Sequence, residues 1–259
     1  MTGLSNNPYA PPNASVTDLD AGDGKLIPGG RTVPAGNGLG WIGSAWNLFK
    51  QAPGPWIGMF IIFVVAWLVL SVIPLINLLT TLFFPVFMGG FMLAANNQRA
   101  TGSLNIGDLF AGFQQKAGPL VILGLLTLAF TIVAFIPSII IAVAGGATAL
   151  AAGSLDNLGA ILGTVGVAVV VGVALVSLVY AAVWFAPALI VLHDMQPFEA
   201  MKTSFFACFR NWTAGLLYFL LAILVMLIAI IPFGLGLLVA GPVMYASIYT
   251  AYRDIFIEE

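Results

Sequence analysis

Charged residues are missing from four long stretches of the chain, at residues 51–98, 117–155, 157–192 and 211–252. Apolar side chains fill these stretches in continuous runs, without the alternation of apolar and polar residues that a transmembrane β-strand shows. The hydrocarbon core of a bilayer is about 30 Å thick, and a helix needs about 20 apolar residues to cross it. Each stretch is long enough for one or two passes, so the pattern predicts an all-α membrane protein.

The lengths of these stretches predict six transmembrane helices, at approximately 56–74, 77–96, 119–142, 160–186, 213–232 and 234–252. The alternative is that one of the two middle stretches contains two passes, which would move every later residue to the opposite side. The basic residues argue against it, because six passes place all eight of them on one side and leave only Asp156 in the opposite loops. The positive-inside rule makes the basic side the cytoplasm, so we predict that both termini are cytoplasmic.

The six predicted spans pair into three hairpins, each preceded by a segment with the pattern of an amphipathic helix at the membrane interface. These segments end at Lys50, Lys116 and Arg210. Their apolar positions are Trp41, Ile42, Ala45, Trp46, Leu48 and Phe49 in the first, Ile106, Leu109, Phe110 and Phe113 in the second, and Phe198, Met201, Phe205, Phe206 and Phe209 in the third. Asn105 and Asp108 predict a capping box at the start of the second segment. The sequence therefore predicts three related hairpin units.

Small residues and prolines recur at corresponding points of these units. Pro74, Pro137 and Pro232 each follow an isoleucine near the end of a first span, where a proline suits a hairpin turn. The pair Gly89 and Gly90 permits close approach of helices. The same holds for a group of glycines in the fourth predicted span: Gly159, Gly163, Gly166 and Gly172.

A second set of prolines, Pro85, Pro187 and Pro242, lies deeper in the second span of each unit, where we expect a kink or a break. Broken helices at corresponding points of repeats are typical of transporters, whose freed backbone groups meet the substrate. A kink that neighbouring helices absorb is the commoner outcome. These three prolines are thus candidate path positions, with a purely structural role as the alternative.

Composition agrees with a membrane protein and narrows its partners. Hydrophobic residues make up 61% of the 259 residues and charged residues only 7%, against about 25% in soluble domains. The net charge of −2 and the lack of a basic tract argue against a nucleic-acid partner. Cys208 is the only cysteine, which excludes an intramolecular disulfide. The bilayer itself is the partner that this composition indicates.

Residues 1–36 are polar, rich in proline and glycine, and poor in large apolar side chains. They bury too little surface to offset the entropy cost of ordering, so we predict a disordered cytoplasmic tail followed by a membrane domain at 37–259. Residues 7–12, with the sequence NPYAPP, have the pattern of a polyproline docking peptide. A plain tail is the simpler interpretation.

The predicted spans contain no Asp, Glu, Lys, Arg or His. Proton relays, carboxylate-bound cations and intramembrane protease chemistry all need such groups. We therefore expect a protein that is not an enzyme and that binds neither a cofactor nor a metal. Two polar pairs, His193–Asp194 and Arg253–Asp254, come at the ends of predicted spans, and we interpret both as helix terminations.

Several short motifs carry a resemblance that covers most of residues 34–256. They are Pro34-Ala35-Gly36, Gly40-Trp41, Leu48-Phe49-Lys50, Pro55-Trp56-Ile57, Ser71-Val72-Ile73-Pro74, the run from Pro85 to Gly90, the run from Gly107 to Phe113, and the run from Tyr252 to Phe256. With these residues the chain resembles a family of uncharacterised inner-membrane proteins, chiefly from proteobacteria. It is more distantly similar to the membrane domain of some glycerophosphodiester phosphodiesterases, although this sequence has no counterpart of their catalytic barrel. The resemblance implies a bacterial inner (cytoplasmic) membrane location and brings no activity and no functional residues.

These observations favour a non-enzymatic inner-membrane protein that organises, assembles with or binds other membrane components, either lipids or a membrane-protein partner. The alternative is a transporter or channel for a neutral or apolar solute, with the breaks at Pro85, Pro187 and Pro242 lining its path.

Overall fold

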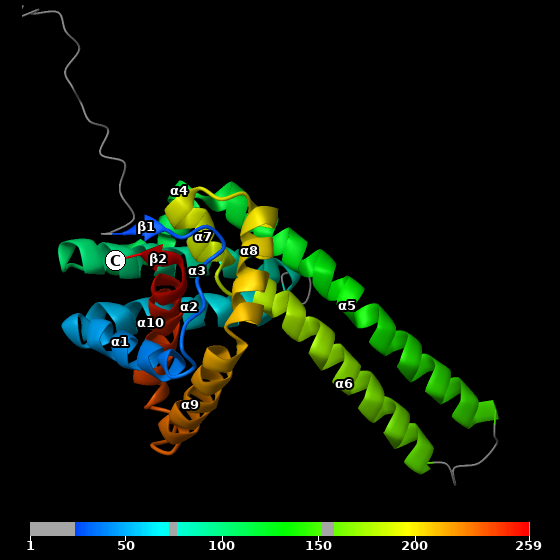
Figure 1. The fold of residues 1–259 in the computed structure, drawn as a ribbon. Helices are drawn as coiled ribbons and strands as arrows, with labels where there is room; N and C mark the ends of the chain where they lie inside the picture. The colour runs from blue at the N-terminus through cyan, green and yellow to red at the C-terminus, as the bar shows by residue number, and fades with distance from the viewer. Residues whose placement is uncertain (1–23, 73–76, 152–157, 259) are drawn as a thin grey trace, which may run out of the picture.

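The computed structural model describes residues 24–72, 77–151 and 158–258, and helices make up nearly all of them (Figure 1). In chain order the elements are β1 (Lys25–Leu26), α1 (Asn37–Gln51), α2 (Pro53–Val72), α3 (Asn77–Thr101), the 3-10 helix η1 (Ile106–Phe110), α4 (Ala111–Gln115), α5 (Ala117–Ala151), α6 (Leu158–Val183), α7 (Ala186–His193), α8 (Pro197–Arg210), α9 (Trp212–Ile230), α10 (Leu237–Phe256) and β2 (Ile257–Glu258).

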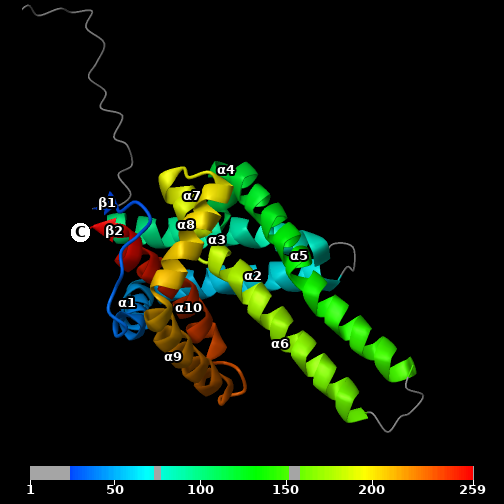
Figure 2. The same cartoon turned by 45° about the vertical axis from the view of Figure 1, so that its right-hand side comes forward.

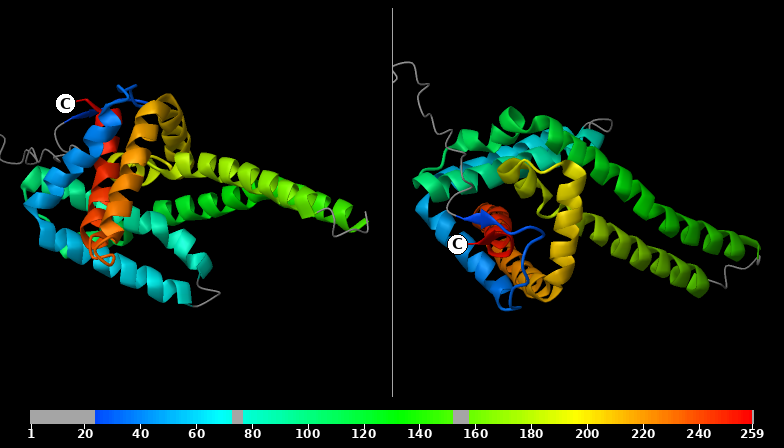
Figure 3. Two further views of the ribbon diagram at one scale, coloured as in Figure 1. Left: turned by 90° about the horizontal axis from the view of Figure 1, so that it is seen from below. Right: turned by 45° about the horizontal axis from the view of Figure 1, so that its top comes forward.

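Three helical hairpins, α2–α3, α5–α6 and α9–α10, form the bulk of the molecule. A shorter helical element precedes each hairpin: α1, then η1 with α4, then α8. The hairpins point in different directions, and the α5–α6 hairpin extends away from the other helices in every view (Figures 1, 2 and 3). The predicted order of elements is therefore present, whereas the relation of the three hairpins as repeats of one unit stays a prediction.

Four helices in the described part of the chain are long and apolar enough to cross a membrane: Pro53–Val72, Ala117–Thr148, Gly159–His193 and Trp212–Ile230. Only 11–28% of the most apolar part of each is buried within the protein, so most of these side chains face outward as lipid contact requires. α3 and α10 are not among these four. The protein is thus an all-α membrane protein, and the six-span topology stays a prediction.

α3 and α10 instead supply much of the buried core. Tyr249, Tyr252 and Phe256 of α10 and Phe91 of α3 are among the largest fully buried side chains. The rings of Phe91 and Tyr245 stack with centroids 4.7 Å apart. Aromatic pairs at this distance contribute about 0.5–1.5 kcal/mol beyond the burial of their area. The two least apolar helices of the three hairpins thus supply many of the buried side chains.

The prolines interrupt fewer helices than the sequence predicts. Pro137 lies inside α5, which continues to Ala151, so the expected hairpin turn at Pro137 is wrong, while the span end at residue 142 stays a prediction. Pro85 and Pro242 also lie inside unbroken helices. A proline removes one backbone hydrogen bond, and neighbouring helices in a membrane protein can compensate for that loss. Pro232 does lie in the turn between α9 and α10, while Pro74 falls outside the described residues.

Glycine permits close helix contact in α3 and at one of the four glycines predicted in α6. A Cβ atom on Gly90 would lie 2.0 Å from the carbonyl oxygen of Leu109, and one on Gly112 would lie 2.2 Å from that of Val86. α3 and the η1–α4 segment therefore meet backbone to backbone. In α6, a Cβ atom on Gly172 would lie 2.8 Å from Oγ of Ser138 in α5, so this glycine also permits a close contact, whereas Gly159, Gly163 and Gly166 have no neighbouring atoms within 4 Å of a Cβ position in the described chain.

The predicted disordered tail at 1–36 extends too far along the chain. β1 pairs antiparallel with β2, with Lys25 opposite Glu258 and Leu26 opposite Ile257. Val33 is buried in the main hydrophobic core. Hydrogen bonds from distant residues order this segment, which its own composition does not reveal. Residues 1–23, which include the docking-peptide pattern at 7–12, and Asp156 lie outside the described residues.

Candidate functional site

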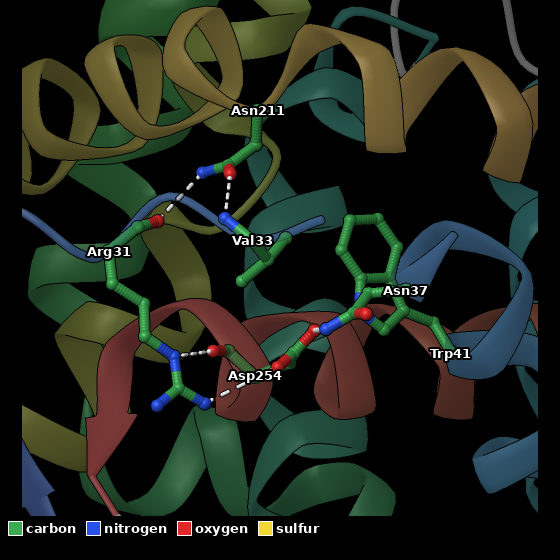
Figure 4. A network of polar contacts seen from close by, with 6 residues as sticks. All are labelled: Arg31, Val33, Asn37, Trp41, Asn211 and Asp254. Atoms are coloured by element: carbon green, nitrogen blue, oxygen red, sulfur yellow. Dashed lines mark hydrogen bonds and ion pairs between the residues drawn. The ribbon is translucent and has the colours of Figure 1, made fainter. Parts of the chain in front are cut away.

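A polar network joins the N-terminal segment, α1 and α10 around the carboxylate of Asp254 (Figure 4). Oδ2 of Asp254 accepts hydrogen bonds from the indole Nε1 of Trp41 at 2.8 Å and from Nδ2 of Asn37 at 2.9 Å. Nη2 of Arg31 forms an ion pair with Oδ1 at 3.3 Å, and Nε of Arg31 donates to the backbone oxygen of Asp254 at 2.7 Å. Asp254 is thus a structural connector, a role that its interpretation as a helix termination missed.

The side chain of Asn211 holds the same N-terminal segment from the opposite side (Figure 4). Asn211 lies at the junction of α8 and α9 and is 3% exposed. Its Oδ1 accepts a hydrogen bond from the backbone N–H of Val33 at 2.8 Å, and its Nδ2 donates to the backbone oxygen of Arg31 at 3.0 Å. Burying an amide is favourable only when its donors and acceptor are paired, as they are here. The segment around residues 31–33 is therefore fixed between α10 and the α8–α9 junction.

A polar cavity of about 640 Å³ lies beside this network. α1 contributes one wall, α3 contributes Arg99, and α10 contributes Thr250, Arg253 and Asp254. Arg31 completes the lining from the N-terminal segment. The volume lies within the range of small-molecule sites, about 300–1,000 Å³. The cavity concentrates three of the chain's eight basic residues in one place, which their sequence positions alone did not predict.

An apolar groove of about 580 Å³ lies between α6, α8 and α9. Tyr180, Trp184, Leu216 and Phe219 line it, and Tyr180 and Leu216 are about half exposed. α6 and α9 both belong to candidate membrane spans, so the groove opens toward the lipid. Gly215 also lines it, and no atom lies within 4 Å of the position of a Cβ there. The groove therefore has room beyond its present side chains.

Ser204 and Cys208 lie on the face of α8 that turns toward α6 and the groove. The hydroxyl of Ser204 donates to the backbone oxygen of Ala181 at 2.8 Å and accepts from the backbone N–H of Phe185 at 3.0 Å, where α6 gives way to α7. Burial raises the pKa of the Cys208 thiol to about 12. The thiol is protonated at neutral pH, so Cys208 is an apolar wall residue of the groove rather than a nucleophile.

The three prolines predicted as path positions do not meet at one site. Pro187 follows the break between α6 and α7 and lines an apolar cavity of about 140 Å³ together with Phe84 and Met88 of α3. Pro85 and Pro242 are buried in continuous helices and are not among the lining residues of this cavity. A helix break is therefore present at Pro187, whereas the helices around Pro85 and Pro242 are continuous; a kink at these two positions and a path role for any of the three stay predictions.

The pair His193–Asp194 ends a helix, as predicted. Asp194 has a left-handed backbone conformation, with φ of 54°, and caps α7. Its carboxylate forms an ion pair with Lys116 at the start of α5, and Nε2 of His193 is hydrogen-bonded to the hydroxyl of Tyr252. In the described part of the chain, no three His, Cys, Asp or Glu side chains come together as metal ligands would.

Comparison with known proteins places the chain among inner-membrane proteins. It is 30% identical over 250 residues to a probable inner membrane protein of Burkholderia thailandensis, and the match covers 86% of this chain and 92% of that protein. No protein-family model matches the chain, and no solved structure matches it. The distant similarity to the membrane domain of glycerophosphodiester phosphodiesterases is therefore unconfirmed.

This relationship and the apolar helices agree on the location of the protein. Several helices of the described chain are long and apolar enough to cross a bilayer, so the protein is an integral, multi-pass protein of the inner membrane. The side on which its termini lie stays a prediction from the basic residues. The chain belongs to the family of uncharacterised inner-membrane proteins that the Burkholderia protein represents.

Proposed function

We propose that this inner-membrane protein is a non-enzymatic, lipid-interacting factor that holds an acyl chain of a bilayer phospholipid in the groove between α6, α8 and α9. The observation that carries the proposal is an apolar groove of about 580 Å³ whose two long walls are membrane-spanning helices. A lipid chain reaches such a groove from the bilayer without crossing water. Retention of particular lipids would make the protein an organising or assembly factor of the membrane around it.

The outer face of α8 supports contact with lipid beyond the groove. Phe198, Phe206 and Phe209 are each more than half exposed on this helix. Large apolar side chains on a short helix next to membrane spans are typical of helices that lie in the interface, where the rings enter the boundary between headgroups and acyl chains. A membrane-protein partner is the other candidate for this face.

The polar groups of the described chain support a role other than catalysis. The Asp254 carboxylate accepts hydrogen bonds from Trp41 and Asn37 and forms an ion pair with Arg31. The Asp194 carboxylate forms an ion pair with Lys116. Burial raises the pKa of the Cys208 thiol. An active site needs a nucleophile, a base and a group that orients them, and these side chains serve packing instead.

A photoactivatable phospholipid, with the reactive group on its acyl chain, tests the proposal in nanodiscs that contain the full-length protein. We expect crosslinks in the groove peptides of α6 and α9 to exceed those in the equally apolar, lipid-facing surface of α5. Gly215→Leu fills the groove and should remove this excess. Gly166→Leu is the matched control, because Gly166 is equally open but is not among the groove residues. Crosslinks spread evenly over all lipid-facing helices, or unchanged in Gly215→Leu, would contradict acyl-chain binding.

A transporter or channel for a neutral or apolar solute is the second candidate, and the helix break at Pro187 favours it. The break adjoins the cavity of about 140 Å³ and leaves a helix end inside the protein. Flux of an apolar solute into proteoliposomes, compared between wild type and Pro187→Ala, tests this function. The controls are Pro85→Ala and Pro242→Ala, which alter unbroken helices. Flux that only Pro187→Ala abolishes would support the transporter over the lipid-interacting factor.

A further inference from the structure

The polar face of α1 is solvent-accessible and lines an open cavity beside α3 and α10. Its positions recur every three or four residues, at Asn37, Gly40, Ser44, Asn47 and Gln51, which places them on one side of the helix. All five line the polar cavity of about 640 Å³. The opposite wall comes from the ends of α3 and α10, so segments far apart in the sequence build one open polar cavity.

The charges of this cavity are strongly unbalanced. Among its described lining residues, Arg31, Arg99 and Arg253 carry guanidinium groups, and Asp254 carries a carboxylate. Three positive charges against one negative charge leave an excess of two. Arg253 is 5% exposed, so part of this charge lies where the local dielectric is lower than in water and attraction to an anion is stronger. An excess of positive charge among the residues of one cavity, with one of its guanidinium groups buried, points to an anionic ligand.

We propose that this cavity binds the phosphate group of a hydroxyl-bearing phosphate ester. The planar guanidinium group presents paired N–H donors that match phosphate oxygens. A phosphate monoester carries about −1.5 to −2 charges at neutral pH, which balances the excess of the lining. The amides of Asn47 and Gln51 and the hydroxyl of Ser44 lie along the same cavity and suit the hydroxyl groups of such a ligand. The phosphate belongs either to such a soluble monoester or to a phospholipid headgroup such as phosphatidylglycerol, whose diester phosphate carries one negative charge and offsets half of the excess.

This site is separate from the acyl-chain groove of the proposed function. Trp41 is the residue that lines both, while Arg99 lines only the cavity and Gly215 lines only the groove. Arg99→Gln therefore tests phosphate binding without filling the groove. Gly215→Leu tests acyl-chain binding without changing the charge of the cavity. If the phosphate proposal is wrong, Arg99→Gln has no effect on binding. If the acyl-chain proposal is wrong, Gly215→Leu has no effect on crosslinking. The failures of the two proposals are therefore distinguishable.

The experiment uses the full-length protein in nanodiscs of phosphatidylcholine, a lipid without net charge. In one arm, calorimetric titration measures the affinity for inorganic phosphate and for glucose 6-phosphate. In the other arm, phosphatidylglycerol is added to the nanodiscs and native mass spectrometry counts the anionic lipid that stays bound. Arg99 is exposed at its helix end, so Arg99→Gln is expected to fold. Lys50→Gln, at an exposed basic residue outside the cavity, is the control for loss of one charge.

We expect Arg99→Gln to weaken phosphate binding by about 10- to 100-fold, as loss of a charged hydrogen-bond donor does. Arg99→Lys keeps the charge but loses the paired donors, so its effect should be smaller. Lys50→Gln should leave the affinity unchanged. Sensitivity of the titration to Arg99 assigns the site to a soluble ester, and sensitivity of phosphatidylglycerol retention assigns it to a headgroup. Absence of binding in both arms, or equal effects of Arg99→Gln and Lys50→Gln, would overturn the proposal.

Discussion

Helices α1 and α8 have similar places in the chain and bury different kinds of side chain. Each leads into an apolar span, and each has a phenylalanine followed by a basic residue in its last turn, Phe49-Lys50 in α1 and Phe209-Arg210 in α8. Phe49 is 4% exposed and Phe209 is 63% exposed. Two helices with the same closing pattern thus place the equivalent ring on opposite sides, one inside the protein and the other on its surface.

The surfaces on which the two helices pack explain this difference. α1 lies against α9 and α10, where Trp41, Ile42 and Phe49 enter the core (Figure 3). α8 lies across α6 and α7 and presents Ala200, Ser204 and Ala207 to them, all fully buried. Small residues bring the α8 backbone close to its neighbours and leave no space for phenylalanine rings on that side. A periodic pattern of apolar residues therefore predicts a helix, but the neighbouring helices decide which face of that helix is buried.

The largest expected effect comes from truncating the two equivalent rings. Phe49→Ala should lower the free energy of unfolding by about 3–5 kcal/mol, because it leaves a cavity in the core. Phe209→Ala should change it by no more than about 0.5 kcal/mol, since no core contact is lost. Unfolding by sodium dodecyl sulfate in mixed micelles measures both. Equal losses for the two variants would show that the α8 ring is packed after all.

A second test concerns the close contact between α1 and α9. A Cβ on Gly38 would lie 2.0 Å from the carbonyl oxygen of Ala214, so Gly38→Ala forces the two helices apart. We expect a loss of about 1–3 kcal/mol in the free energy of unfolding. Gly43 belongs to the same helix and is open around its Cβ position, so Gly43→Ala should instead stabilise by about 0.5–1 kcal/mol. A stabilising Gly38→Ala would mean that α1 lies farther from α9.

Removing the buried hydroxyl of Ser204 tests whether α8 packs through this face. Ser204→Ala leaves the backbone N–H of Phe185 without its acceptor, at a cost of about 1–2 kcal/mol in the free energy of unfolding. The control is Ser177→Ala, whose exposed hydroxyl bonds only to Val173 within its own helix and should cost less than about 0.5 kcal/mol. The same micelle titration applies. A neutral Ser204→Ala would show that α8 does not pack through this face.

The smallest expected effect is a labelling rate that reports the orientation of α8. Cys208 lies on the buried side, and its raised pKa of about 12 means that less thiolate forms at a given pH than in an ordinary cysteine. Reaction with a thiol reagent should therefore be slow near neutral pH and still increase with pH above about 9, where an unfolded thiol is already mostly ionised. The protein denatured in detergent is the control. Equally fast labelling of the folded protein would indicate that α8 is turned, with Cys208 outward.

The parts of the fold that could be predicted depend on residues close together in the chain. The capping box of Asn105 and Asp108 is present, with the Asn105 N–H donating to the Asp108 carboxylate at 3.1 Å. Asp194 ends α7 as expected. Capping needs only residues within one helical turn. Membrane insertion similarly depends on the apolar content of about 20 consecutive residues, and so the four spans could be recognised.

The candidate sites could not be predicted, because residues far apart in the sequence form them. Asp254 binds Arg31 and Trp41, more than 200 positions away. Asn211 has no local pattern that indicates its bonds to the backbone of Arg31 and Val33. The spacing of Asn37 and Trp41 places both on one face of α1, but it does not indicate that both donate to Asp254. For the same reason the ordered segment at 24–36 was predicted to be disordered.

By itself the sequence determined that this protein resides in a bilayer, where its helices lie along the chain and where several of them end. Partition into a bilayer and helix capping depend only on short stretches of chain. The tertiary structure decided which face of α1 and of α8 is buried, which prolines interrupt a helix, and where three arginines gather. Those outcomes depend on the shape and polarity of the surface that each helix meets. That surface is made by distant residues, so only the folded chain contains it.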